Sequence, residues 1–486
     1  YSSAASDVYK RQELMPQLNT AQLKSWLFDV RLWILVLLLL RLENIDLAPF
    51  DEHNWRQTMT LGVARNYAEV DGNFFHPRTI ICDSRGGIFA QEFPLFNYCV
   101  FLLWEVFGAH NWCFRLFNLV VATIGLWAFA NIARRLANEK AALFATVMFG
   151  VSVAFVYARK GMPDVFAVSL ALVGVYWGWR FLEEKKTQQL VLFGVFAALG
   201  MLCKMPAACI MALLTAAFWN ESVDKTARAQ LVKVGAVAVA AMAAWYFLWV
   251  PWTDRIHGFP LFFPTSLAEG WRQLVEMKAD TIARFYPIAL TSRIAFLFCL
   301  LGLGIAIWRK NKPILLTFAA SSVLLFGLML KAGGTFSGHV YYIIPFVPMM
   351  ALLAGYGLSE SVRNPWIQLV ILLAITTEAV YKHKYDFFIP WEDQKFVKLE
   401  KMVDQYVPKD SRILVNNHEG SPVMMYAAHR RGWTVTDRMK DSAWVAGEST
   451  VGMNYLVIER SRWRDSLPFP KLYEDNEFQI YKTKKD

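Results

Sequence analysis

The sequence predicts an all-α polytopic membrane protein that carries a small α/β domain at its C-terminal end. Of its 486 residues, 56% are hydrophobic and 19% are charged, whereas soluble domains are typically about 25% charged. Long apolar runs recur between residues 32 and 381, and the charged composition of a soluble domain returns after residue 382. The 19 tryptophans and 18 tyrosines fit the aromatic belts of membrane proteins.

The apolar runs predict about eleven transmembrane helices. We leave residues 1–12 out of the fold argument, because they read as a non-native leader. The expected membrane domain then covers residues 13–381, and the expected α/β domain covers residues 382–486. The predicted spans are residues 28–46, 114–136, 141–157, 165–182, 190–201, 207–219, 231–249, 287–308, 314–330, 343–358 and 366–380.

The distribution of lysine and arginine predicts the orientation of these spans. Segment 93–107 is short for a span and contains polar residues, so we read it as an interfacial helix. Five connecting loops on one side are then all basic, as expected on the cytoplasmic side. Two long loops, 48–111 and 251–286, and the C-terminal domain fall on the outer side. The basic loops contain Arg134-Arg135 with Lys140, Lys185-Lys186, Lys225 with Arg228, Arg309-Lys310 with Lys312, and Arg363.

Several functional classes receive no support from the sequence. The net charge of +10 is what basic cytoplasmic loops produce in a membrane protein, so it does not indicate nucleic-acid binding. The six cysteines form no C-x-x-C pair and are expected as small core residues. We assign no metal ligands and no cofactor, although a divalent metal stays open.

The first outer loop begins with a dense group of reactive side chains. Asp51 or Glu52 could serve as the general base for a hydroxyl, or both could be solvated loop acids. Arg56 suits a phosphate, or a salt bridge to one of these acids. His53 is a weak metal-ligand candidate because no second histidine lies at ligand spacing.

Further charged residues fall on the same predicted side. Glu92 and Asp164 could line a cavity with Asp51, or they could cap helix N-termini. Arg159, Lys160 and Lys204 are cations on the outer side, where an anionic partner such as a phosphate is expected. Snorkelling is the alternative for Lys204.

A glycine-containing loop precedes the span at residues 343–358. It includes Gly333-Gly334, His339 and Tyr342. The glycines indicate a loop close to a ligand, and His339 is either an acid/base group or an ordinary polar loop residue. Without a Walker or dinucleotide context, Gly333-Gly334 is a weak phosphate signal.

The order of these motifs resembles the GT-C type membrane glycosyltransferases, and within them the protein O-mannosyltransferase and lipid A aminoarabinose transferase superfamily (family 39-like). The resemblance covers roughly residues 25–360. The motifs that carry it are Asp51-Glu52, Arg56, Ala64-Arg65-Asn66, Glu92-Phe93-Pro94-Leu95, Phe107-Gly108, Arg115-Leu116, Met162-Pro163-Asp164, Lys204-Met205-Pro206, and Tyr341-Tyr342 with Pro345 and Pro348.

The resemblance implies transfer of a sugar from a polyprenyl-phosphate carrier to a glycan, lipid or protein hydroxyl on the outer side of a bacterial inner membrane. Asp51 would be the catalytic carboxylate, with Glu92 and Asp164 in the same cavity. Glu52, His53, His339 and Tyr342 would support the site. The cations that would hold the carrier phosphate are Arg56, Arg159, Lys160 and Lys204. The segment after Asp51 departs from the aminoarabinose enzymes, so their acceptor does not carry over.

Two other functions compete with this one. A transporter or flippase for a lipid-linked anion would also place charges at membrane depth, but the chain has no internal repeat. A noncatalytic assembly protein would not need adjacent carboxylates beside several outward cations. Neither the sugar nor the acceptor follows from the sequence.

Overall fold

The structure is a computed structural model of the chain. It describes residues 20–83, 85–89, 91–219, 222–258, 265–417, 420–435 and 438–483. The expected leader, residues 1–12, lies outside the described residues, as do residues 259–264 of the second outer loop.

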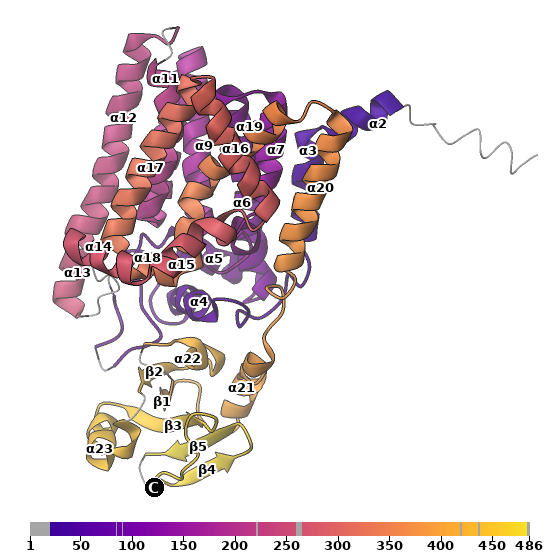
Figure 1. The fold of residues 1–486 in the computed structure, drawn as a ribbon. Helices are drawn as coiled ribbons and strands as arrows, with labels where there is room; N and C mark the ends of the chain where they lie inside the picture. The colour runs from indigo at the N-terminus through magenta and orange to yellow at the C-terminus, as the bar shows by residue number, and fades with distance from the viewer. Residues whose placement is uncertain are drawn as a thin grey trace, which may run out of the picture.

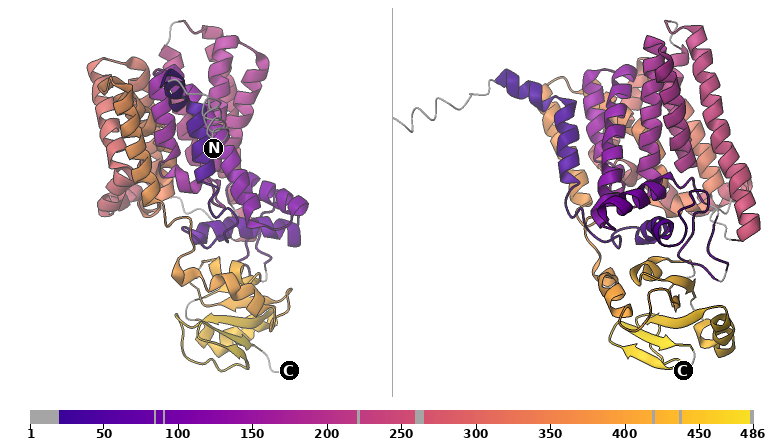
Figure 2. Two further views of the ribbon diagram at one scale, coloured as in Figure 1. Left: turned by 90° about the vertical axis from the view of Figure 1, so that its right-hand side faces the viewer. Right: turned by 180° about the vertical axis from the view of Figure 1, so that it is seen from behind.

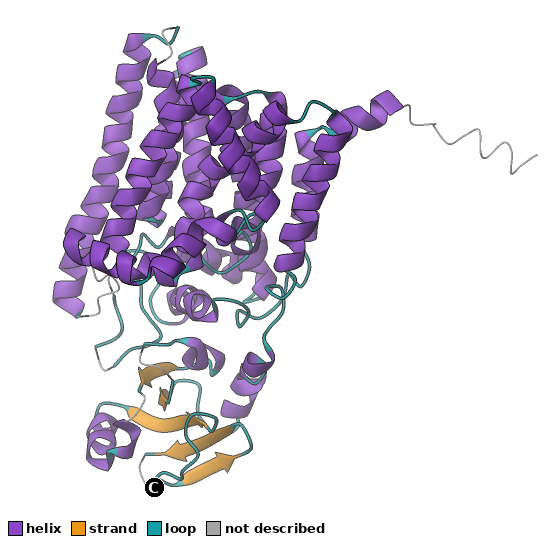
Figure 3. Cartoon of the chain, in the orientation of Figure 1, coloured by secondary structure: helices purple, strands orange, loops and turns teal. Residues whose placement is uncertain are grey.

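A helical bundle forms the larger part of the molecule (Figures 1 and 3). Its helices are mostly apolar, and central ones such as α9 and α19 are buried along most of their length. The bundle helices are α3 (Val30–Leu40), α6 (Asn111–Leu136), α7 (Glu139–Gly150), α8 (Ala154–Tyr157), α9 (Pro163–Glu184), α10 (Thr187–Cys203), η1 (Met205–Leu214), α11 (Thr215–Trp219), α12 (Lys225–Ala244), η2 (Trp245–Trp249), α16 (Arg293–Trp308), α17 (Lys312–Ala332), η4 (Val340–Phe346), α19 (Val347–Ser361) and α20 (Pro365–Lys382).

Five helical segments within the described residues are long and apolar enough to cross a membrane, and a sixth is added if the bent pair Lys278–Ala289 and Arg293–Trp308 forms one span. The predicted eleven spans all contain helix, but several are short or broken. The first ends at Leu40 because Arg41 turns inward and donates to the carbonyl oxygens of Gly150 and Phe155. The count of eleven stays a prediction.

The five basic loops gather at one end of the bundle, as the positive-inside argument predicts. Ion pairs join them across neighbouring helices: Arg135 contacts Glu183, Lys185 contacts Asp224, and Arg309 contacts Glu360. We call this the basic end. The helix α2 (Thr20–Leu27) also lies there and projects from the bundle (Figure 1).

The two long loops cover the opposite end, which we call the loop end. In the first loop, α4 (Asn54–Glu69) and α5 (Leu95–Phe107) lie across the bundle axis instead of along it (Figure 2). This arrangement agrees with an interfacial position for α5. The remaining elements of the loop end are α13 (Val250–His257), α14 (Leu267–Glu276), α15 (Lys278–Ala283), η3 (Arg284–Ala289) and α18 (Gly334–Gly338).

The C-terminal domain sits below the loop end and contains a mixed five-stranded sheet (Figure 1). Its strand order is β2-β1-β3-β5-β4, in which β1 is parallel to β2 and β3, and β5 is antiparallel to β3 and β4. Apolar or alternating runs in the sequence predict strands at residues 413–416, 455–459 and 477–482, and helical periodicity predicts a helix at 395–406. The structure has a strand or helix at each place, and the α/β class is confirmed. The elements are η5 (Trp391–Asp393), α21 (Phe396–Val403), β1 (Arg412–Val415), α22 (Val423–Ala427), β2 (Arg431–Thr434), η6 (Arg438–Lys440), α23 (Ser442–Thr450), β3 (Met453–Glu459), β4 (Lys471–Glu474) and β5 (Phe478–Lys482).

Helix α4 connects this domain to the bundle. At its start, Asn54 donates to Asp393 over 2.8 Å and Trp55 donates to the carbonyl of Gly420. Further along, the guanidinium of Arg65 stacks 3.9 Å from the centre of the Tyr426 ring. The helix that follows Asp51 is therefore held against the C-terminal domain along its length.

Candidate functional site

Local sequence places the charged side chains of the loop end. Helix α4 begins at Asn54, so Arg56 lies in its first turn, close to Asp51 in the chain. Pro163 occupies the first turn of α9, where its missing N–H leaves no hydrogen bond unmade. Asp164 follows it at the start of a buried helix. Lys204 lies at the break between α10 and η1, in extended backbone conformation.

The first group of charges is the Asp51 triad, which we define as Asp51, Arg115 and Lys160. Asp51 is 2% exposed, and Arg115 and Lys160 are fully buried. Arg115 donates to both Asp51 oxygens over 3.3 Å, and the Lys160 ammonium donates to Oδ2 over 3.2 Å. Gln57 donates to Oδ1 over 2.6 Å. Both oxygens of Asp51 are therefore occupied by donors.

The triad keeps Asp51 ionised. Burial alone raises the pKa of this carboxyl, but the charges of Arg115 and Lys160 outweigh that effect and lower its pKa to about 2. The sequence analysis expects Asp51 to act as a general base. In this arrangement it can accept a proton only after one of its cations moves away.

The second group is the Lys204 cluster, which we define as Arg56, Glu92, Asp164 and Lys204. Glu92 Oε1 accepts from both Arg56 Nη2 and Lys204 Nζ, the latter over 2.9 Å. Lys204 Nζ also lies 3.4 Å from Asp164 Oδ1. Burial raises the pKa of Glu92, but the charges of Arg56 and Lys204 lower it to about 2. The cluster joins α4, the first loop, α9 and the α10 break.

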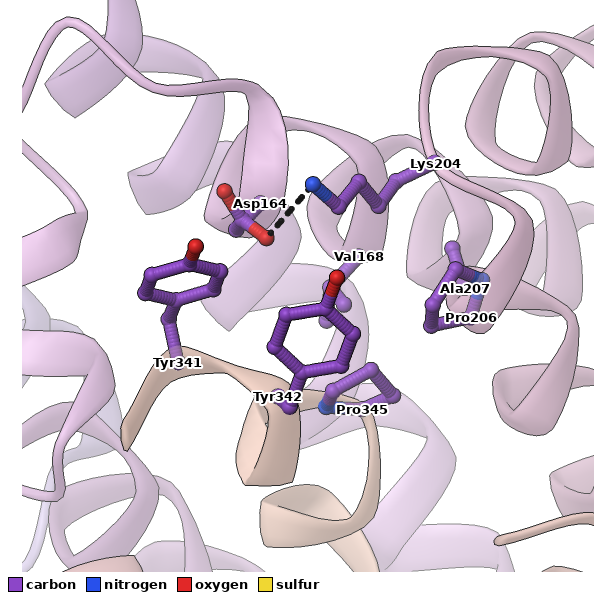
Figure 4. A pocket seen from close by; sticks show the side chains of 8 residues that line it. All are labelled: Asp164, Val168, Lys204, Pro206, Ala207, Tyr341, Tyr342 and Pro345. Carbon is purple, nitrogen blue, oxygen red and sulfur yellow. Dashed lines mark ion pairs between the residues drawn. The ribbon is translucent and has the colours of Figure 1, made fainter. Parts of the chain in front are cut away.

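The carboxylate of Asp164 is only partly satisfied by hydrogen bonds and ion pairs. Its side chain is only 6% exposed, yet Oδ2 has no hydrogen-bond partner within the described parts of the chain. Asp164 and Lys204 line a small cavity together with Tyr341 and Tyr342, and the tyrosines lie on the opposite wall (Figure 4). The cavity has a volume of about 10 Å³, about the room of one water molecule. A larger ligand needs movement of the η4 segment.

Aromatic rings link the two groups. The His53 ring lies 5.5 Å from Tyr157 and 5.4 Å from Tyr341, measured between ring centres. The His339 ring stacks 5.3 Å from Tyr341. Burial, followed by the nearby charge of Lys160, lowers the pKa of His53 to about 4, so its ring is neutral at neutral pH. The His53 ring is therefore uncharged, although the two neighbouring groups contain four cations: Arg56, Arg115, Lys160 and Lys204.

Two predicted site residues lie apart from these clusters. Arg159 is 2% exposed, but it donates to the carbonyl oxygens of Glu43 and Asn44 and stacks on Phe387. Its guanidinium thus fixes the end of the first span. The Glu52 carboxylate is half exposed and lies 3.4 Å from His53, while its backbone carbonyl accepts from Lys160.

An apolar groove adjoins the Lys204 cluster. It has a volume of about 600 Å³ and is lined by aromatic residues of the first loop and of α12 to α13, including Phe93, Trp245 and Trp249. Phe93 follows Glu92 directly, and its backbone N–H donates to the carbonyl of Leu202, two residues before Lys204. One end of the groove therefore lies next to Glu92 and Lys204 of the charged cluster.

Known proteins resemble part of this chain in sequence and most of it in fold. Residues 91–249, which include Glu92, Asp164 and Lys204, match the family described as dolichyl-phosphate-mannose-protein mannosyltransferase. The apo structure of ArnT from Cupriavidus metallidurans is 12% identical, with a TM-score of 0.60 over 93% of this chain and 97% of that one. The family match is confined to residues 91–249, and the likeness to ArnT shows that the two chains share a fold.

Two further structures resemble the chain in fold. ArnT bound to undecaprenyl phosphate has the same TM-score of 0.60, at 12% identity over 93% of this chain and 98% of that one. Archaeoglobus fulgidus AglB, an oligosaccharyltransferase in complex with an inhibitory peptide and a dolichol-phosphate, has a TM-score of 0.52 at 12% identity, over 88% and 69% of the two chains. No curated protein matches the chain by sequence.

The structure adds residues to which the sequence analysis gave no role. Arg115, Gln57 and Tyr341 contact the candidate site directly. Arg115 lies near the start of the apolar helix α6, and an arginine in an apolar segment is itself a signal of a buried partner. Gln57 is a polar residue among many, so no sequence signal distinguishes it.

The described residues offer no evident ligand set for a resident metal. Within the described residues, no group of three or more histidine, cysteine, aspartate or glutamate side chains is placed to hold an ion. The carboxylates of the loop end are paired with Arg56, Arg115, Lys160 and Lys204 instead.

Proposed function

We propose that this protein is a glycosyltransferase that moves a sugar from a polyprenyl-phosphate carrier to a hydroxyl acceptor at the loop end, on the extracytoplasmic side of a bacterial inner membrane. The observation that carries the proposal is the Lys204 cluster, in which cations and carboxylates border a cavity beside an apolar groove. A lipid-linked phosphate needs both surfaces at once.

The groove suits the isoprenoid part of such a donor. Its aromatic walls offer apolar contact along the outside of α12, and its inner end reaches Phe93 and Leu202. A chain lying there would bring its phosphate to Lys204 and Arg56. The undecaprenyl phosphate and dolichol-phosphate bound by ArnT and AglB are lipids of this chemical class.

The cations would stabilise the departing carrier phosphate. As the bond between the anomeric carbon and the phosphate oxygen breaks, negative charge grows on the phosphate, and a buried lysine or guanidinium stabilises it strongly. Arg56 and Lys204 are both held near Glu92 before the donor arrives. We assign them to the phosphate, and we assign Lys160 to the control of Asp51.

Two carboxylates compete to deprotonate the acceptor. Asp164 has a free oxygen at the cavity, so it can accept a proton there without losing an existing hydrogen bond. Asp51 would become available if an arriving phosphate drew Lys160 away from it, because the anion and the carboxylate compete for the same ammonium. We propose that Asp164 accepts the proton of the acceptor hydroxyl, and that Asp51 serves as a second base only when Lys160 has moved to the phosphate.

The orientation follows from the two ends of the bundle. The ion pairs that gather the basic loops at one end support a cytoplasmic basic end under the positive-inside rule. The loop end and the C-terminal domain would then face the periplasm. The sugar and the acceptor are left to experiment.

The test uses purified protein in lipid bilayers with radiolabelled polyprenyl-phosphate sugars and a cell-envelope acceptor extract. We expect label on an acceptor with the wild type and little with Asp164→Asn. Asp83→Asn is the matched control, because Asp83 lies in the same loop, outside the cavity, and pairs with Arg85. Movement of the carrier across the bilayer without label on any acceptor would instead favour a flippase.

A further inference from the structure

A second cavity lies at the basic end, far from the Lys204 cluster in the fold. It has a volume of about 760 Å³ and is walled by α2, α3, α6, α7 and the start of α20. Four cations line it, Lys24, Arg31, Arg134 and Lys140, with the acids Asp29 and Glu139 between them. None of these residues belongs to the candidate transfer site.

The charges in this cavity do not cancel. Arg31 pairs with Asp29 over 2.7 Å, and Arg134 lies 2.6 Å from Glu139. In the part of the chain that the structure describes, Lys24 and Lys140 make no ion pair, and both are exposed. Two ammonium groups from different helices thus face one cavity without a counter-charge, which is the electrostatic requirement of an anion site.

The cavity also has an apolar wall that a soluble anion would not use. Arg134, Asn131 and Trp127 lie three and four residues apart on α6, so they form one stripe along the helix. From Arg134 to Trp127 the stripe runs about 10 Å toward the middle of the bundle. Leu143 of α7 lines the same cavity. The lining therefore changes from charged to apolar along the bundle axis.

The neighbouring surface continues this apolar wall. On α3, Leu32, Leu35 and Leu39 are 37%, 50% and 56% exposed, and they follow one face of the helix. On α2, Trp26 is also largely exposed, as expected of an aromatic residue at a membrane interface. A charged cavity that opens beside such a surface fits a molecule with an anionic head and an acyl body.

We propose that this cavity binds the headgroup of an anionic phospholipid from the leaflet at the basic end. Lys24 and Lys140 contact the phosphate, and the acyl chains run along Trp127 and the exposed face of α3. Basic pockets between helices on this side of a membrane are suited to such headgroups. The proposal does not depend on sugar transfer, since the site uses neither the carrier cavity nor its groove.

The experiment measures lipid binding to the full chain by native mass spectrometry from detergent. Phosphatidylglycerol is compared with phosphatidylcholine of the same acyl chains, in wild type and in the double variant Lys24→Gln/Lys140→Gln. The matched control is Lys310→Gln/Lys312→Gln, which removes two exposed lysines from the same end but outside the cavity. A separate arm adds inorganic phosphate to the phosphatidylglycerol complex.

We expect phosphatidylglycerol to bind more tightly than phosphatidylcholine, and the double variant to lose roughly tenfold to thirtyfold in affinity for it. The control should keep the wild-type preference, and inorganic phosphate should not displace the lipid. Equal binding of the two lipids, or an unchanged preference in the double variant, overturns the proposal. Full displacement by phosphate alone would overturn it too, in favour of a free-anion site. Equal unfolding midpoints of wild type and variant without added lipid show that the substitutions act on binding.

Discussion

The Asp51 triad and the Lys204 cluster are built from the same kinds of side chain but differ in how they are satisfied. In the triad, Oδ1 of Asp51 accepts from Gln57 and Arg115, and Oδ2 accepts from Arg115 and Lys160. In the cluster, one oxygen of Glu92 takes both cations, and Asp164 keeps Oδ2 without a partner among the described residues. We call the triad closed because both Asp51 oxygens accept hydrogen bonds, and we call the cluster open because Oδ2 of Asp164 has no partner among the described residues.

This difference distinguishes a group that stabilises the structure from a group that can bind a proton or a ligand. A buried charge that has all its partners contributes to the structure, and removing one partner leaves the other charge unsatisfied at a cost of several kcal/mol. A buried carboxylate oxygen that lacks a partner can accept a proton or a ligand without first breaking a bond. We therefore expect substitutions in the triad to reduce stability, and substitutions at Asp164 to reduce turnover.

The sharpest test of the comparison is Asp164→Asn, with the largest expected effect. Transfer should fall by roughly a hundredfold to ten-thousandfold, the typical range for a positioned proton acceptor. The unfolding midpoint should stay close to wild type, because only the contact with Lys204 weakens. Steady-state transfer and thermal unfolding are measured on the same preparation. Near-normal turnover would remove Asp164 from the mechanism.

The next effect should come from opening the triad. Arg115→Ala leaves Asp51 with a single cation in a buried setting, so we expect a loss of about 3–5 kcal/mol of stability. Folded yield and thermal unfolding in lipid report it. Arg31→Ala is the control, because its pair with Asp29 is largely exposed and should contribute less than about 1 kcal/mol. Equal effects of the two substitutions would contradict the closed-triad interpretation.

A smaller effect is expected when the open cluster loses one of its two cations. Lys204→Gln should raise the apparent KM for the lipid-linked donor by roughly tenfold, the value of one hydrogen bond to a charged group. Lys278→Gln, an exposed lysine at the same end, serves as the matched control. Donor titrations of initial rate separate KM from kcat. A pure loss of kcat would move Lys204 from donor binding to the chemical step.

The smallest effect concerns an exposed contact, His429, between the C-terminal domain and α4. Its two ring nitrogens lie 2.8 Å from Glu400 and 2.7 Å from Glu69, and these hydrogen bonds raise its pKa. The same contacts lower the pKa of both carboxyls, Glu400 and Glu69. The contact is therefore strongest above the unfolded pKa of glutamate, about 4.3, and below that of histidine, about 6.5.

The sign of the pH effect follows from the raised histidine pKa. Stabilisation is complete below the unfolded pKa of His429 and is lost as pH rises through its folded pKa. Hydrogen exchange over residues 54–69 should therefore quicken, relative to a His429→Gln variant, as pH rises from about 6 to 8. Comparison with the variant at each pH cancels the intrinsic exchange rate. Parallel curves for the two proteins would exclude this role of His429.

Much of the architecture was predictable because membrane insertion constrains the apolar length and the loop charges of the sequence. Apolar length marks helices, and basic loops such as Arg134-Arg135 and Lys185-Lys186 mark one side. The C-terminal strands β1 and β3 follow from short apolar runs, and β5 follows from alternation of polar and apolar residues. The strands β2 and β4 were missed because neither contains an apolar run: β2 contains Gly432, and β4 has a largely exposed surface.

The sequence by itself determined which residue types meet at the loop end. Asp51, Arg56, Glu92, Asp164, Lys160 and Lys204 were all identified from charge in or beside apolar segments, and each is buried there. The sequence did not predict which partner each charged residue would contact. Arg56 was expected to pair with Asp51 or Glu52 if it formed a salt bridge, and it pairs with Glu92 instead. Arg159 was expected at the phosphate, and it holds the backbone of the first span.

Only the tertiary structure decided which carboxylate is closed and which is open. Ion pairing depends on distances between groups that are 64 and 109 residues apart from Asp51 in the chain, at Arg115 and Lys160. Those distances are set by how α6, α9 and the α4 loop pack, whereas charge and hydropathy report only the depth at which each residue lies. The sequence therefore indicates how deep in the membrane a charged residue lies, but its ion-pair partner depends on how the helices pack.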